Sequence, residues 1–327
     1  MKKTKTISRL ILIVMLVAIV GCGNALGAEA PALSVDQLVI AAAAQGGDWY
    51  SIAVGYGEVF KKHLNLNFYS VTPGGGAANP SLVNMGEADL GISVAISVNE
   101  AHNGIESYTE KHDNMLMFAT QFPQVVQAVV WADSNINSIE DLKGKKVAVG
   151  PKGATGEIVA QRVLEAYGMS YADLGSVSYV AFGDAISEMT DKRLDCCFST
   201  LSMPYPGYTE LNMSGQIRLL QISDEAISFV HNINPGYLSQ VFEPNTTYDG
   251  IDYEWKTLVT PNAVVVRADM SEEDVYLLFK AYVEGMDEIK AAGPAMRPVV
   301  VGPMLVQDIG VPYHPGVIRY AKEQGWL

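Results

Sequence analysis

Three glycine-rich turns hold the residues whose types and spacing are best suited to binding a small molecule. They span residues 46–50, 74–77 and 152–156, and each is expected to lead from a strand into a helix. Backbone N–H groups and the positive end of the helix dipole meet at such a helix start, which favours anions such as carboxylates. Glycine lets the backbone come close to a ligand because it has no side chain. One such turn is more often only a turn, but three at equivalent places predict a binding site.

Side chains in these turns add further binding chemistry. Thr155 supplies a hydroxyl and Lys152 a positive charge, while Trp49 and Tyr50 are suited to wall the apolar part of a ligand. Asp48 has two interpretations. It either caps the helix that follows, or it faces the pocket, where its charge repels a carboxylate and favours an amine or hydroxyl group.

The sequence carries no catalytic or metal-binding signature. Its five histidines are scattered, with no H-E-x-x-H spacing and no cluster with cysteine. No nucleophile elbow, P-loop or dinucleotide-binding motif occurs. Cys196 and Cys197 are adjacent in an apolar strand pattern, and we interpret them as two core residues. We therefore expect no enzyme, no cofactor and no metal site, with an enzyme on the same architecture as one alternative.

The elements that would position the three turns alternate between strand and helix. Apolar residues from Trp49 to Phe60 recur at helical spacing on one face. Strands are expected at 38–44, 67–71, 88–94, 115–119, 127–131, 146–150, 177–182, 195–200, 216–222 and 263–267. The stretch 232–256 is expected to be an irregular surface excursion. The alternation predicts an α/β protein with mainly parallel sheets flanked by helices, arranged as two similar lobes.

The first 30 residues predict a signal peptide. Four basic residues precede an unbroken apolar run from Leu10 to Val20, which is too short to span a membrane and is typical of a secretory signal. Cys22 follows Ile19-Val20-Gly21 in a lipobox-like pattern, which predicts lipidation of Cys22 after cleavage before it. The alternative is ordinary cleavage near residues 25–30. We expect an exported protein that is either free in the periplasm or tethered by a lipid.

The charge balance limits the kinds of partner. The chain has 22 Lys and Arg against 36 Asp and Glu, a formal net charge of −14. Such an acidic protein is a poor partner for nucleic acid and for anionic lipid headgroups. The length of 327 residues is sufficient for two α/β lobes.

Several motifs, taken in order, resemble one family. They are Gly46-Gly47 with Trp49-Tyr50, Gly74-Gly75 with Asn79, the segments 86–91, 141–150 and 182–199, Pro204, and the ending 311–320 with its His-Pro-Gly. Together they resemble the TAXI-type solute receptors, which are the substrate-binding components of TRAP transporters. The resemblance covers nearly the whole chain after the signal peptide.

The resemblance implies a two-lobed receptor of the periplasmic-binding-protein type II class, often called a Venus flytrap. Lobe I would comprise residues 31–125 and 262–327, and lobe II residues 126–261. A small carboxylate or amino-acid-like ligand would bind between the lobes of a monomer, and TRAP membrane subunits would receive it. A receptor that feeds a membrane sensor is a further alternative.

The resemblance also implies a set of binding residues, to which Lys152 is added for its charge. The expected ligand-binding residues are Gly47, Asp48, Trp49, Tyr50, Gly75, Gly76, Ala77, Ser93, Val94, Lys152, Thr155, Gly156, Thr200 and Pro204. The chain departs from the family where Gly153-Ala154-Thr155-Gly156-Glu157 replaces the usual Gly-Ser-Gly-Thr-Glu. This change and the acidic Asp48 argue against a simple glutamate receptor.

Overall fold

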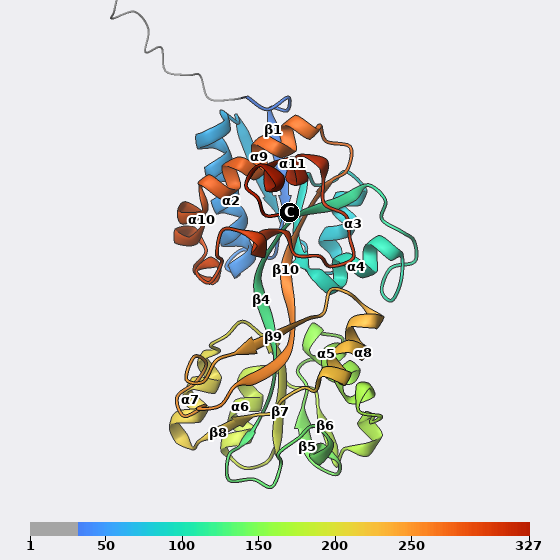
Figure 1. The fold of residues 1–327 in the computed structure, drawn as a ribbon, viewed down its shortest axis with the longest axis vertical. Coiled ribbons are helices and arrows are strands. Elements are labelled where there is room, and N and C mark those ends of the chain that lie inside the picture. Colours follow the sequence, from blue (N-terminus) through green and yellow to red (C-terminus); the bar gives the residue numbers. More distant parts are fainter. Residues whose placement is uncertain (1–31) are drawn as a thin grey trace, which may run out of the picture.

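The chain forms two lobes that are connected by two long strands (Figure 1). The computed structural model describes residues 32–327. The expected signal peptide and Cys22 lie outside the described residues. Within the described part, no helix is both long enough and apolar enough to cross a bilayer.

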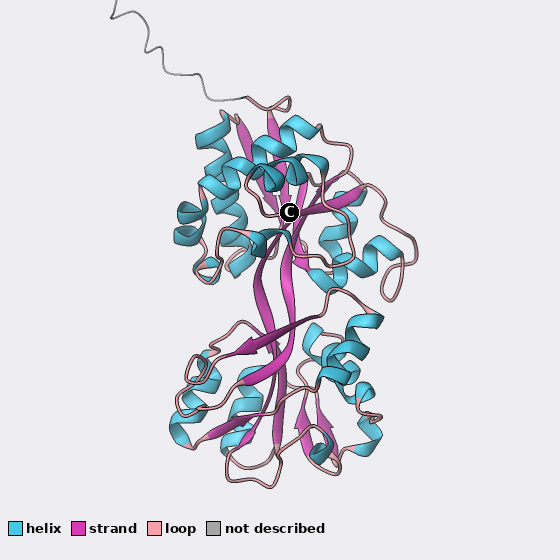
Figure 2. Cartoon of the chain, in the orientation of Figure 1, coloured by secondary structure: helices cyan, strands magenta, loops and turns pink. Residues whose placement is uncertain are grey.

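One ten-stranded sheet runs through both lobes. Its strand order is β2-β1-β3-β10-β4-β7-β5-β6, with β8 paired to β4 and β9 paired to β10. The strands are β1 (Gln37–Ala41), β2 (Phe68–Thr72), β3 (Leu90–Val94), β4 (Met115–Trp131), β5 (Lys146–Ala148), β6 (Ser176–Ser178), β7 (Cys196–Leu201), β8 (Ile217–Leu219), β9 (Leu238–Phe242) and β10 (Trp255–Arg267). Figure 2 shows β4 and β10 passing side by side from one lobe into the other.

Helices cover both faces of the sheet in each lobe. Lobe I contains β1 to β3, and lobe II contains β5 to β9 (Figure 1). The helices of lobe I are α2 (Asp48–Leu64), α3 (Ala78–Asn84), α4 (Ala95–Asn103), α9 (Glu272–Glu284), α10 (Met286–Ala292) and α11 (Pro315–Glu323). Those of lobe II are α5 (Thr155–Ala166), α6 (Phe182–Thr190), α7 (Pro206–Ser214) and α8 (Asp224–Ile233).

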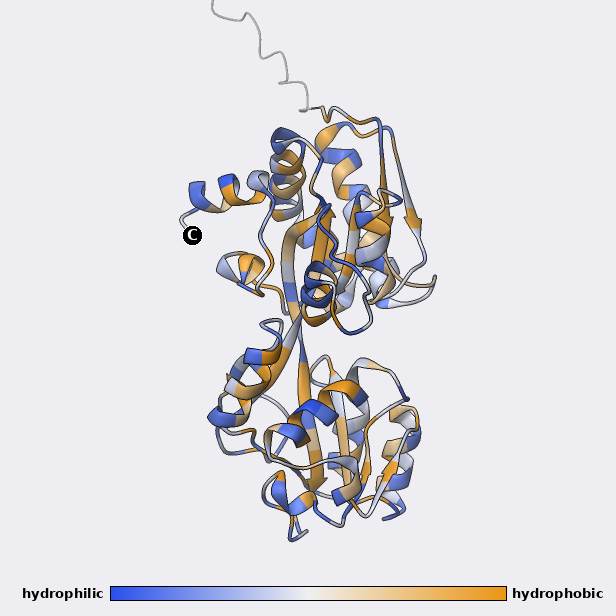
Figure 3. Cartoon of the chain, turned by 90° about the vertical axis from the view of Figure 1, so that its right-hand side faces the viewer, coloured by the Kyte–Doolittle hydropathy of each residue, from blue (hydrophilic) through white to orange (hydrophobic). Residues whose placement is uncertain are grey.

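Two of the buried clusters are named here the α2-side core and the α5-side core. The α2-side core, in lobe I, joins residues of α2 such as Tyr56 to Val264 of β10. The α5-side core, mainly in lobe II, joins residues of α5 such as Val159 to Leu258 of β10. Figure 3 shows the apolar colouring concentrated on the strands inside each lobe.

The α/β class and the two-lobed architecture predicted from the sequence are confirmed. Parallel pairing holds at the two edges, where β1 pairs with β2 and β3, and β5 pairs with β6 and β7. The central strands β10 and β4 pair antiparallel with their neighbours. Cys196 and Cys197 are buried and free, and they belong to cores on opposite faces, as predicted. The lobe bounds 31–125, 262–327 and 126–261 stay predictions.

Two expectations about strands were wrong. The segments 115–119 and 127–131 belong to one strand of 17 residues, because β10 pairs with β4 along the stretch between them. The stretch 232–256 is not wholly irregular, because β9 within it pairs with the first half of β10. Both errors have one cause: partners distant in sequence stabilise these strands, and local patterns do not reveal them.

The two lobes also touch along a seam, defined here as Glu100, Glu106, Arg162, Asn234 and Gly236. Asn234 Nδ2 donates to the backbone oxygen of residue 96 in α4 at 3.1 Å. Arg162 of α5 forms an ion pair with Glu106 at 2.7 Å. A Cβ placed on Gly236 would lie 2.6 Å from the backbone of residues 95 and 96, so the lobes can approach this closely only with glycine there.

Glu100 makes the seam sensitive to pH. Burial raises the pKa of its carboxyl to about 7, and repulsion from Glu106 adds to the rise, while Asn234 and Arg162 act in the opposite direction. A folded-state pKa above the unfolded-state value favours the folded protein when the carboxyl is protonated. This stabilisation is complete below the ordinary pKa of 4.5 and is lost as the pH rises through about 7.

Replacement of Glu100 by Gln is therefore expected to stabilise the protein at pH 8 and to change little at pH 5. The gain at pH 8 is on the order of 1 kcal/mol, because solvent screening of this half-buried group reduces the energy that the pKa rise implies. Melting temperatures measured from pH 5 to 8 check this, with the exposed Glu140→Gln as control. Equal pH profiles for wild type and Glu100→Gln would contradict it.

Candidate ligand-binding site

The first two glycine-rich turns lie together at the carboxyl ends of the lobe I strands. Helix α2 begins at Asp48, its N-cap is Gly47, and no side chain caps it. The Trp49 side chain packs against both the α2-side core and the α5-side core. A Cβ placed on Gly76 would lie 3.5 Å from the Trp49 ring. The Trp49 ring thus lies beside the second turn and contacts both cores.

A buried amide holds the second turn in place. Asn79 is fully buried, and its Nδ2 donates to the backbone oxygens of Ala42 in lobe I and Ile92 of β3. Its Oδ1 accepts the N–H of Gly75 at 3.0 Å. Ser93 Oγ donates to the Gly76 oxygen at 2.5 Å. The ends of β1 and β3 are therefore fastened to the turn by side-chain hydrogen bonds.

The third turn forms the start of α5 in lobe II. The N-cap of α5 is Ala154, which supplies no side-chain hydrogen bond to the helix. Gly156 is buried, and a Cβ placed on it would lie 3.6 Å from the backbone nitrogen of Thr200 and 3.0 Å from the Phe182 ring. Glycine at this position brings the α5 start close to the end of β7.

The expected binding residues differ in their exposure to solvent. Ser93, Val94, Gly156 and Thr200 are buried, and half-buried residues include Trp49 and Thr155. Gly47, Tyr50, Gly75 and Gly76 are also half-buried.

The other four expected residues are exposed: Asp48, Ala77, Lys152 and Pro204. Lys152 Nζ lies 5.8 Å from the centre of the Tyr179 ring, and the Ala77 oxygen accepts the Tyr108 hydroxyl. The N-cap interpretation of Asp48 is wrong, because Gly47 adopts the extended cap conformation and Asp48 already belongs to the first turn of α2.

A row of polar side chains crosses β10, β4 and β7 between the two lobes. On β10, Leu258 belongs to the α5-side core and Val264 to the α2-side core. Thr260 and Asn262 lie between them on the same face, because alternate residues of a strand share a face. Gln124 holds the equivalent place on β4 and is the cross-strand partner of Thr260.

The row continues onto the neighbouring strands. Asn262 is the cross-strand partner of Val94 on β3. Thr200 on β7 pairs with Val126 of β4, a member of the α5-side core. We call Gln124, Thr200, Thr260 and Asn262 the polar floor. Trp49 and the α5 start approach this floor from lobe I and lobe II.

Three atoms of the polar floor make no hydrogen bond within the described part of the chain. They are Thr200 Oγ1, Thr260 Oγ1 and Asn262 Oδ1. Thr260 and Asn262 are fully buried and Thr200 is 7% exposed. Eight buried side-chain atoms lack a hydrogen-bond partner in the described part of the chain, and three of them lie in this row. Since buried polar groups in native proteins are nearly always hydrogen-bonded, the row is a candidate place for a polar ligand or water.

Sequence reasoning found Thr200 but missed the other three floor residues. A usable signal existed, because each long strand has a proline next to at least one polar residue inside a largely apolar run. The motifs are Pro123-Gln124 and Thr260-Pro261-Asn262. The two prolines are cross-strand partners. The sequence alone could not show that these distant motifs meet.

The arrangement is suited to binding a small anion. Two helices with no side-chain cap begin on either side of the floor, and their N-termini carry positive partial charge. The floor residues are neutral and supply hydrogen bonds. Among residues 32–327, no group of three or more His, Cys, Asp and Glu side chains could hold a metal ion.

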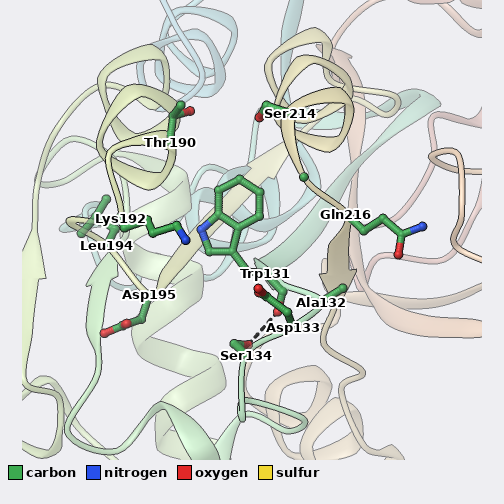
Figure 4. Close-up of a pocket in the computed structure, with 11 residues that line it drawn as sticks. Trp131, Ala132, Asp133, Ser134, Thr190, Lys192, Leu194, Asp195, Ser214 and Gln216 are labelled. Carbon is green, nitrogen blue, oxygen red and sulfur yellow. Dashed lines mark hydrogen bonds between the residues drawn. The ribbon is translucent and has the colours of Figure 1, made fainter.

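A cavity of about 730 Å³ lies elsewhere, at the far end of lobe II (Figure 4). Trp131, the last residue of β4, lies at its centre, with Lys192 beside it. Of its polar groups, Ser134 Oγ donates to the Trp131 oxygen and Asp195 accepts the backbone N–H of Lys146, whereas Trp131 Nε1 makes no hydrogen bond in the described part of the chain. None of the expected binding residues lines this cavity.

Solved structures of solute-binding proteins are similar to this chain. A TctC solute binding protein from Polaromonas matches with a TM-score of 0.52 at 15% identity, over 78% of this chain and 86% of that one. The periplasmic aliphatic sulphonate binding protein SsuA from Escherichia coli matches with a TM-score of 0.47 at 16% identity, over 81% and 82%. At such identities the likeness to the TctC protein shows the two-lobed fold alone.

The family is shown by a match that covers most of the chain. The model of the NMT1-like family matches residues 40–325, which include all three glycine-rich turns, the polar floor and the ending 311–320. The chain therefore belongs to the NMT1-like family.

Proposed function

We propose that this protein is an extracytoplasmic solute-binding receptor. It captures a small carboxylate or amino-acid-like molecule between its two lobes and delivers it to the membrane subunits of a TRAP transporter. The observation that carries the proposal is the polar floor, with its three buried atoms that make no hydrogen bond in the described chain. Membership of the NMT1-like family and the ordered TAXI-like motifs support it.

The geometry of the floor supports capture between the lobes. The anionic group of the ligand is proposed to bind at the α5 start, where Gly156 lies against the backbone of Thr200. Trp49 would cover the ligand from lobe I, since its ring packs against the cores on both sides of the floor. A ligand in this position touches both lobes at once, so its binding favours their approach.

The strands that connect the lobes are suited to bending. Pro123 and Pro261 are cross-strand partners in the β4–β10 pair, and neither can donate a backbone hydrogen bond. The register also shifts between Pro261 and Ala263. We propose that the lobes rotate about this place when ligand enters or leaves, and that the membrane subunits recognise the closed arrangement.

Binding of a small acid is expected to stabilise the mature chain. At a ligand concentration of about 100 times Kd the gain is about 2.7 kcal/mol, which raises the melting temperature by several degrees. A thermal-shift screen of carboxylates, amino acids and polyols tests this, together with native mass spectrometry of the purified protein. If no compound stabilises the protein and none is retained, the receptor proposal is wrong.

Replacement of Thr200 by Val is expected to weaken ligand binding without destabilising the free protein. The hydroxyl makes no hydrogen bond within the described chain, so its removal costs the fold nothing. The loss in affinity is about 5- to 30-fold, as for one buried hydrogen bond. Calorimetry with the ligand found in the screen measures it.

Thr257→Val provides the matched control. Thr257 is also fully buried, but its hydroxyl donates to the Val126 oxygen at 2.6 Å. This variant is expected to have a lower melting temperature and unchanged affinity. If both variants lose stability and neither loses affinity, Thr200 is a structural residue and the floor is not the binding site.

A further inference from the structure

The orientation of the Asn262 side chain is fixed by one hydrogen bond. Its Nδ2 donates to the backbone oxygen of Phe122 at 3.0 Å. A carbonyl oxygen can only accept, so the NH2 group must face Phe122 and Oδ1 must face away from it. Oδ1 has no hydrogen-bond partner among the described residues, and the side chain is fully buried. The floor therefore presents a pure acceptor at this point.

Thr260 lies two residues away on the same face of β10, and its hydroxyl is also without a partner in the described chain. A hydroxyl can either donate or accept, so it adapts to its neighbour. Gln124, the partner of Thr260 on β4, is half-buried. No positively charged side chain belongs to this part of the floor.

The acceptor and the α5 start lie at a distance from each other along the floor. Thr200 is on β7 and Thr260 on β10, with β4 between them. Neighbouring strands are about 4.8 Å apart, and Thr200 pairs with Val126 whereas Thr260 pairs with Gln124, two residues further along β4, so the two positions are separated by roughly 12 Å. A ligand with its carboxylate at the α5 start reaches Asn262 only through a group several bonds away from that carboxylate.

The group that reaches Asn262 must donate a hydrogen bond. An amine or hydroxyl satisfies Oδ1, whereas a keto oxygen or a second carboxylate would bring lone pairs against lone pairs. A buried acceptor left unpaired costs as much as a lost hydrogen bond, so a site built in this way discriminates strongly.

We propose that Asn262 and Thr260 form an acceptor subsite that selects ligands by a hydrogen-bond donor remote from their carboxylate. The ligand class is then small acids with an amine or hydroxyl several bonds from the carboxylate, and the matching oxo acids are excluded. This inference rests on the proposed receptor function and specifies what the receptor takes.

Matched probes separate this inference from the receptor proposal. One set is 4-aminobutyrate, 4-hydroxybutyrate and succinic semialdehyde, and the other is glutamate, 2-hydroxyglutarate and 2-oxoglutarate. Within each set one position changes from amine to hydroxyl to oxo, and the hydroxyl and oxo forms carry the same charge. Calorimetry on the wild-type mature chain is expected to give at least one set in which the amine or hydroxyl form binds about tenfold or more tightly than the oxo form.

Two variants assign the selection to the subsite. Thr260→Val removes a hydroxyl that the described chain does not use, so the fold is retained; Asn262→Leu removes the acceptor. Both are expected to reduce the preference for the donor form to about threefold or less, and Asn262→Leu is also expected to bind the oxo form more tightly because the lone-pair repulsion is removed. Thr257→Val is expected to keep the wild-type preference.

The results distinguish failure of the acceptor subsite from failure of the receptor proposal. The acceptor subsite is wrong if the oxo and donor forms bind the wild type equally. It is also wrong if both variants keep the wild-type preference for the donor form. Either result leaves the receptor proposal intact. If no member of either set binds, the acceptor subsite is also wrong. The receptor proposal then depends on whether the wider screen finds another ligand.

Discussion

The antiparallel pairing of β4 with β10 is the constraint on which the rest of the structure depends. These two strands belong to both lobes, so the sheet is continuous from the α2-side core to the α5-side core. Every other strand is connected to one of them, either by direct pairing or through one or two intervening strands. Where Pro123 meets Pro261, neither residue donates to the ladder, so the connection is weakest between the lobes.

The same strands also supply the chemistry between the lobes. Elsewhere their buried positions are mostly apolar, but at the crossing they carry Gln124, Thr260 and Asn262. Buried polar atoms without partners are costly for a fold, which is why they are expected where binding requires them. The glycine-rich turns bring one helix start from each lobe to this place. Ligand binding and the relative position of the lobes are thereby linked through one short stretch of sheet.

The sequence predicted the local features well and the long-range ones poorly. The stripe from Ile52 to Phe60 faces the core as expected, because helical periodicity is a local property. Ser271 caps α9 through its hydroxyl, which accepts the N–H of Asp274, and this contact is also local in sequence. The polar floor was missed apart from Thr200, since Gln124 and Thr260 are 136 residues apart in the chain and meet only through strand pairing. Lipidation of Cys22 stays a prediction.

A crystal structure of the mature chain with its retained or identified ligand tests the central claim most directly. The account predicts ligand density on the polar floor, with a carboxylate at the α5 start, the Trp49 ring against the ligand and a donor group within hydrogen-bond distance of Asn262 Oδ1. Ligand density in the cavity around Trp131, with the floor filled only by protein side chains, would contradict the account.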